Sequence, residues 1–206
     1  MSTKLIPLFL EINISFTKEL THFLDNKQLD LKKRFKFEEI EIKNNVAKFK
    51  NGFPIISLVI KDMRLEIISI FRDREEAYSE ILNVLKVMNF AEDDKLTILK
   101  FRLISILNFD NEQSLHNFFI SSPEPLGEIM ESSLKFQLLR DLKKIMYQFE
   151  FQSDGQANFA NISLETPNEV NIKNFMVSCQ ESESILRDSM DSFLTTRNLP
   201  VSFIGG

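Results

Sequence analysis

Apolar and polar residues alternate with a period of two over much of this chain, and such alternation predicts strands. The period lengthens to that of an amphipathic helix over 18–26, 75–89, 111–121 and 181–197, while the polar stretch 27–34 predicts a loop. Residues 128–146 fit either a helix or a strand. The predicted strands cover 5–16, 35–43, 46–50, 53–61, 64–71, 96–109, 157–165 and 170–179.

The order of these elements recurs. The strand ending at Phe16 is followed by a helical segment that contains His22, and the strand ending at Phe109 is followed by one that contains His116. A recurrence in fixed order indicates duplication. We therefore predict an α+β fold of two tandem strand–helix–antiparallel strands–helix repeats, 1–94 and 95–198, which together form one compact domain. Their strands form one curved, largely antiparallel sheet with helices packed on one face, and 199–206 form a flexible tail.

Composition narrows the classes of function. A chain of 206 residues is long enough to bury a core without a metal or disulfide, and its 20 Phe with no Trp predict a core filled by Phe rings. The net charge of −5 lacks the basic excess that neutralises phosphates, which makes nucleic acid an unexpected partner.

Compartment is indicated by cysteine usage and by hydropathy. The single Cys179 has no partner for an internal disulfide, which fits a reducing compartment. No apolar run approaches the roughly 18 residues of a membrane span. We predict a cytoplasmic protein that does not bind membranes.

Few residues are candidates for catalysis. His22 and His116 occupy matching places in the two repeats, but two histidines alone make a weak metal site. Cys179, predicted at a strand end, would need a nearby histidine to act as a nucleophile. We interpret all three as structural residues and predict a protein that is not an enzyme.

Charged and glycine-rich motifs are also sparse. The cluster of Lys32, Lys33 and Arg34 is either a solvated face or part of a functional surface. His22 and His116 are candidates for the same functional surface. Five glycines and no phosphate-binding loop predict no cofactor. The terminal Gly205-Gly206 resembles a conjugation tail or is simply a chain end.

Three segments carry a resemblance to a known family: Ile6–Phe16, Leu99–Asn108 with Leu115–Phe119, and Ser184–Thr196. In this pattern the chain resembles a sporadically distributed family of uncharacterised bacterial proteins. It departs from the family in length and at Leu107, where the family usually has Tyr. The resemblance implies no activity.

Together these observations favour a non-catalytic protein-interaction module, an accessory component of a bacterial multi-gene system such as defence or stress response. Its partner is another protein or a second copy that forms a homodimer. The alternative is a binder of small molecules or peptides, with a Phe-lined pocket between sheet and helices.

Overall fold

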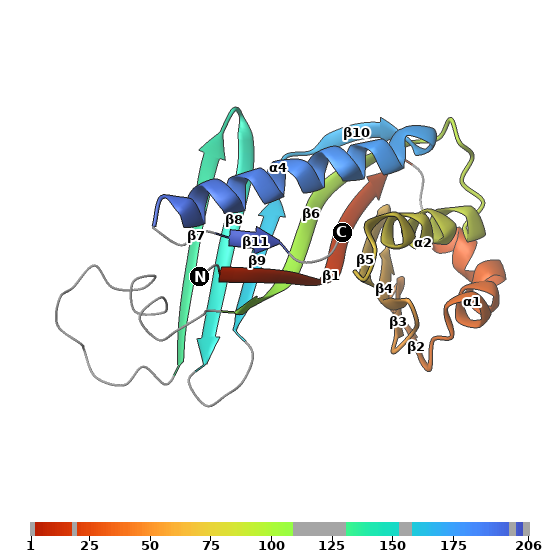
Figure 1. The fold of residues 1–206 in the computed structure, drawn as a ribbon. Coiled ribbons are helices and arrows are strands. Elements are labelled where there is room, and N and C mark those ends of the chain that lie inside the picture. Colours follow the sequence, from red (N-terminus) through yellow and green to blue (C-terminus); the bar gives the residue numbers. More distant parts are fainter. Residues whose placement is uncertain (1–2, 18–19, 109–130, 153–157, 198–200, 204–206) are drawn as a thin grey trace.

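A computed structural model describes residues 3–17, 20–108, 131–152, 158–197 and 201–203. Within helix 21–35 it describes the backbone of 21–26 but not their side chains. The described residues form a mixed α+β fold built on one 11-stranded sheet and three α-helices (Figure 1). None of the helices in these ranges is long and apolar enough to cross a membrane.

Two long strands form the centre of the sheet. Strand β1 (Thr3–Phe16) pairs antiparallel with β6 (Lys95–Asn108) from Lys4 to Phe16. Outward from β1 lie β5 (Arg64–Ile70), β4 (Ile55–Lys61), β3 (Val46–Lys50) and β2 (Glu39–Lys43). Outward from β6 lie β9 (Phe159–Leu164), β8 (Lys143–Gln152) and β7 (Glu131–Arg140).

Two short strands complete the sheet beside this path. Strand β10 (Asn168–Asn171) pairs antiparallel with β6, and β11 (Val201–Phe203) pairs with β1 in the one parallel pairing among the described strands. Strand β11 lies within the stretch predicted as a flexible tail.

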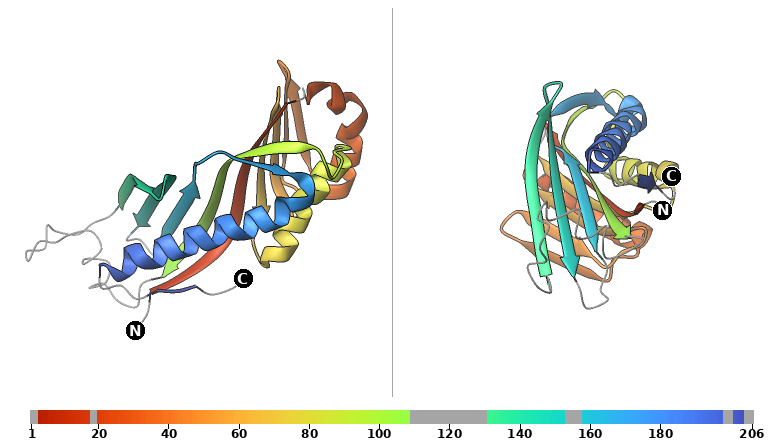
Figure 2. Two further views of the ribbon diagram at one scale, coloured as in Figure 1. Left: turned by 90° about the horizontal axis from the view of Figure 1, so that it is seen from above. Right: turned by 60° about the vertical axis from the view of Figure 1, so that its left-hand side comes forward.

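The helices cover one face of the sheet. Helices α2 (Arg74–Val87) and α4 (Phe175–Thr195) lie side by side against it, and α1 (Thr21–Phe35) lies at the β3 and β4 end (Figures 1 and 2). A 3-10 turn, Ile172–Asn174, leads into α4. Helix α2 is capped at its N-terminus by Asp73, whose side chain accepts a hydrogen bond from the backbone N–H of Glu76 at 2.9 Å.

The core lies between this face and the helices. Six phenylalanines are almost completely buried there, which confirms their predicted role: Phe35, Phe37, Phe49, Phe101, Phe149 and Phe175. A second aromatic group forms where α4 crosses the outer strands, with the ring of Phe193 tilted against those of Phe136 and Tyr147 at centroid distances of 4.9 and 5.0 Å.

Several predicted boundaries were wrong. The loop expected over 27–34 is the second half of α1, because Leu31 and Phe35 bury a helical face that the many lysines mask in the sequence. The strand expected over 170–179 is divided among the end of β10, the 3-10 turn and the start of α4, and Cys179 therefore lies inside a helix. Residues 128–146 resolve into strand from Glu131 onward, and the helix predicted over 111–121 lies outside the described residues.

Candidate functional site on the open face of the sheet

Side chains alternate between the two faces of the sheet, so its register assigns each residue to one of them. Ile12 and Phe101 lie opposite each other and are buried beneath the helices. Their neighbours Glu11 and Arg102, also opposite each other, point to the other face, which we call the open face. Arg102 is in turn opposite Ser163 of β9, so this row of side chains continues outward across the sheet.

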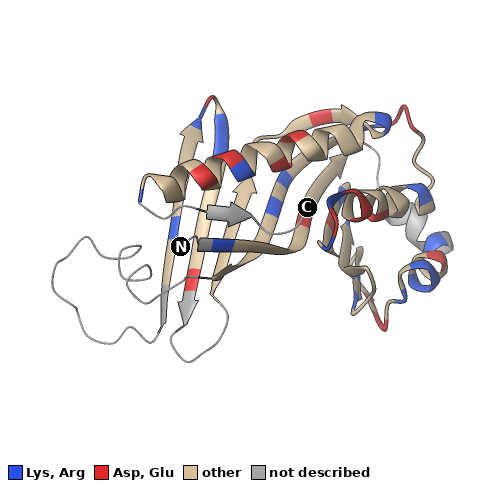
Figure 3. Cartoon of the chain, in the orientation of Figure 1, with Lys and Arg blue, Asp and Glu red and all other residues tan. Residues whose placement is uncertain are grey.

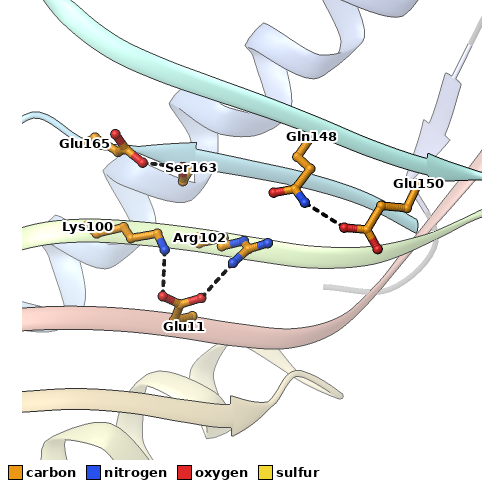
Figure 4. A network of polar contacts seen from close by, with 7 residues as sticks. All are labelled: Glu11, Lys100, Arg102, Gln148, Glu150, Ser163 and Glu165. Carbon is orange, nitrogen blue, oxygen red and sulfur yellow. Dashed lines mark hydrogen bonds and ion pairs between the residues drawn. The ribbon is translucent and has the colours of Figure 1, made fainter. Parts of the chain in front are cut away.

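A three-residue ionic network lies at the middle of the open face (Figure 4). The carboxylate of Glu11 accepts a hydrogen bond from the Lys100 ammonium at 2.7 Å and one from a guanidinium nitrogen of Arg102 at 3.1 Å. The three side chains are only 15 to 23% exposed. Because one carboxylate balances two cations, the network keeps an excess positive charge.

A small polar cavity of about 150 Å³ opens beside this network. Lys100 and Arg102 of β6, Lys135 of β7 and Asn161 of β9 contribute to its lining. Lys135 is exposed and forms no ion pair within the described part of the chain. The cavity therefore gathers three cations and the carboxylate of Glu165. Lys100 and Arg102 share Glu11, and Lys135 has no ion-pair partner among the described residues.

Two buried amide oxygens on the same face have no hydrogen-bond donor among the described residues. They are Oδ1 of Asn13, opposite Lys100, and Oδ1 of Asn161, which lines the cavity and belongs to a side chain only 6% exposed. A buried polar atom without a partner costs about 1–3 kcal/mol. Such an atom in a native fold therefore indicates that a ligand or solvent supplies the donor.

Two further carboxylates lie on the open face, and one of them, Glu165, lines the cavity (Figure 4). Glu150 accepts a hydrogen bond from the side chain of Gln148 at 2.6 Å, and Glu165 lies 3.5 Å from the Lys144 ammonium. Acidic and basic positions are thus interspersed over the strands (Figure 3). The open face is consequently a mixed-charge surface with a local cationic centre.

A second polar cluster lies on the other side of the sheet, where α2 meets α4. The carboxylate of Glu183, almost fully buried, accepts the Tyr78 hydroxyl and Nε of Arg187, and Nε of Arg74 lies 3.8 Å away. Burial, reinforced by the hydrogen bond to Glu183, raises the pKa of Tyr78 far above its ordinary value. Since the cluster joins two helices away from any described cavity, we assign it a structural role.

Cys179 belongs to the same buried region. Burial, with a smaller contribution from Glu183, raises the pKa of its thiol well above the ordinary value. The thiol therefore stays protonated near neutrality, whereas a nucleophilic cysteine needs its thiolate form.

Of the residues singled out from the sequence, the three cations at 32–34 do not lie in the open-face cluster. Lys32, Lys33 and Arg34 form the exposed last turn of α1, where cations interact favourably with the helix dipole. The side chain of His22 and the whole of His116 lie outside the described residues.

Sequence reasoning missed the cluster of Glu11, Lys100 and Arg102. The available signal was a pair of cations two positions apart within the apolar strand 96–109. Their common carboxylate lies 89 residues from Lys100 in sequence, so only the pairing of β1 with β6 brings the charges together.

Neither the protein-family models nor the curated proteins with which the chain was compared gave a match. In the described ranges, no group of three or more His, Cys, Asp or Glu side chains is placed to hold a metal ion.

Proposed function

We propose that this protein is a non-catalytic protein-interaction module whose open face binds an acidic segment of another protein. The observation that carries the proposal is the incomplete pairing at the middle of that face. Two cations share Glu11, Lys135 has no ionic partner among the described residues, and the buried oxygens of Asn13 and Asn161 lack donors there. A binding partner would supply a counter-charge to these cations and hydrogen-bond donors to these oxygens.

An acidic polypeptide segment has the required chemistry. Its carboxylate would pair with Lys135 and with the excess charge at Arg102, in the cavity that both residues line. Its backbone N–H groups would supply donors to Asn13 and Asn161. The partner thus contributes both the acceptors and the donors that the open face needs.

Nucleic acid fits this face less well. Glu11, Glu66 and Glu150 share the open face with the cations, and the whole chain carries a charge of −5. Carboxylates at these positions repel the continuous row of charges along a phosphate backbone, whereas a single peptide carboxylate can meet the cations of the cavity alone. An unpaired amide oxygen also finds no donor on a phosphate group.

We further infer that the two halves of the chain are tandem versions of one strand–helix–strands–helix plan. The strand orders support this reading: β5, β4 and β3 follow one another outward from β1, as β9, β8 and β7 do from β6. We place the module in the cytoplasm because its single cysteine fits a reducing compartment. The resemblance to uncharacterised bacterial proteins supports a role as an accessory component of a bacterial multi-gene system.

The proposal is tested by capturing partners from the cells that produce the protein, using the tagged full chain and two charge-reversed variants. Lys135→Glu changes the open face, while Lys33→Glu is the matched control on the exposed end of α1. Both positions are exposed, so each substitution should change stability by less than about 0.5 kcal/mol. We expect Lys135→Glu to weaken binding of a stoichiometric partner at least tenfold, about 1.4 kcal/mol.

Three results would overturn the proposal. One is equal capture by the wild type and both variants, another is loss of the partner only in Lys33→Glu, and the third is recovery of nucleic acid as the stoichiometric component. Light scattering of the purified chain tests a further alternative: a dimer abolished by Lys135→Glu would make a second copy the occupant of the face.

A further inference from the structure

An apolar recess of about 430 Å³ lies at the bend of β1, apart from the polar cavity. The pairing of β1 with β6 shifts register between Pro7 and Phe9, and β1 changes direction near this point (Figure 1). Side chains from β1 and from the end of β5 form the walls: Ile6, Pro7, Leu8, Phe9, Ile70 and Phe71.

The recess lies at a break in the pairing along one edge of β1. Strand β5 pairs with β1 from Phe9 onward, and β11 pairs with β1 from Thr3 to Leu5. The backbone between them offers little to an added strand. Pro7 has no N–H, and the carbonyl of Leu8 already accepts the N–H of Phe71 at 2.8 Å. The recess can therefore hold a ligand through apolar side chains but is poorly suited to an extended peptide.

One cation stands among the described lining residues. Arg72 follows the end of β5, and its guanidinium lies 5.6 Å from the ring centroid of Phe53. It forms no ion pair within the described part of the chain. The recess thus combines apolar walls with one cation that lacks a carboxylate.

We infer that this recess binds a single-chain amphiphile with an anionic head group. The aliphatic chain packs against Ile6, Phe9 and Ile70, and the head group pairs with Arg72. The volume lies within the roughly 300–1,000 Å³ of small-molecule sites, and few positioned polar groups are needed to orient such a ligand. Carboxylate and phosphate heads share the chemistry that Arg72 recognises.

The test measures binding of four probes to the full-length protein by calorimetry, each below its micelle concentration: decanoate, dodecanoate, dodecyl phosphate and dodecylamine. Burial of each added methylene should tighten binding about fourfold, until the recess is full. Dodecanoate should bind at least about tenfold more tightly than dodecylamine. The ratio between dodecanoate and dodecyl phosphate identifies the preferred head group.

Two arginine variants separate the role of the head group from that of the walls. Arg72→Gln should abolish the preference for the anionic head, while Arg64→Gln, at the opposite and exposed end of β5, should leave it unchanged. Absence of saturable binding by all four probes would overturn the inference. So would equal affinity for dodecanoate and dodecylamine, or an unaltered preference in Arg72→Gln.

This site lies on the same face as the acidic-partner surface, since Phe9 is opposite Ile104 and Ile104 is opposite Asn161, but no described residue lines both the recess and the polar cavity. Loss of amphiphile binding in Arg72→Gln should leave partner capture intact, and Lys135→Glu should leave amphiphile binding intact. Failure of either proposal therefore does not entail failure of the other.

Discussion

Removal of the Glu183 carboxylate should be among the most damaging single changes on the helical side of the molecule. Its two oxygens accept the hydroxyl of Tyr78 and Nε of Arg187, with Arg74 close by. In Glu183→Ala the hydroxyl of the fully buried Tyr78 loses its acceptor, and two cations lose their common counter-charge.

The loss of stability in Glu183→Ala depends on how far the two arginines are exposed to solvent. Breaking a fully buried ion pair costs about 3–5 kcal/mol because it leaves an uncompensated charge. Arg187 and Arg74 are 16% and 39% exposed, so both can turn partly toward water, and we expect the lower end, about 3 kcal/mol. Tyr78→Phe removes only the hydroxyl and should cost about 1.5–3 kcal/mol.

Urea unfolding of the full chain measures both losses. A double-mutant cycle of Tyr78→Phe and Glu183→Gln should give a coupling free energy of at least about 1 kcal/mol, since the two groups touch. Glu181→Gln, exposed on the same helix, is the control and should change stability by less than about 0.5 kcal/mol. If Glu183→Ala cost no more than this control, the assigned role of the cluster would be refuted.

Four further predictions concern stability and reactivity. Because the pKa values of Cys179 and Tyr78 are raised, the unfolded chain releases these two protons first, near pH 9.0 and 10.0. The stability that the two protonated groups contribute should therefore be fully present below pH 9.0 and fall above it, by up to about 1.4 kcal/mol per pH unit for each group, and Tyr78→Phe should flatten this decline in urea titrations. Cys179 should react with a thiol reagent only after denaturation, and rapid labelling of the native protein would contradict its burial. Gly52→Ala should cost at least about 2 kcal/mol, because a Cβ there would overlap the carbonyl of Ile55 and lie 2.7 Å from that of Phe35; a neutral effect in thermal unfolding would count against this turn geometry. Asp73→Ala should cost about 1 kcal/mol by loss of the α2 cap, whereas Asp73→Asn should keep most of the stability.

Local patterns predicted much of the sheet. The strand prediction for 64–71 matches β5, and that for 96–109 matches β6, because each strand buries alternate side chains beneath the helices. The α+β class and the large antiparallel sheet are therefore confirmed. Strand order depends instead on contacts between distant residues, as in the pairing of Glu11 with Arg102, and lies beyond the reach of local periodicity.

The errors arose where two patterns compete. Five of the eight residues at 27–34 are charged, and of the two leucines only Leu31 is buried, so the sequence gives little sign of the helical face. Around Cys179, three small buried serines at helical spacing, Ser178, Ser182 and Ser189, look polar in the sequence although they face the core. The open-face cluster was missed because a charge is recognised as part of a site only when its neighbours in space are known.

The central claim is that the open face binds the partner, and lysine acetylation of the full chain tests it most directly. Mass spectrometry would compare the modification rates of the free protein and of the captured complex. The account predicts protection of Lys100 and Lys135 on the open face, with unchanged rates at Lys33 and Lys86 on the exposed helix surfaces. Protection of Lys33 and Lys86 with no change at Lys100 and Lys135 would place the partner on the helices and contradict the account.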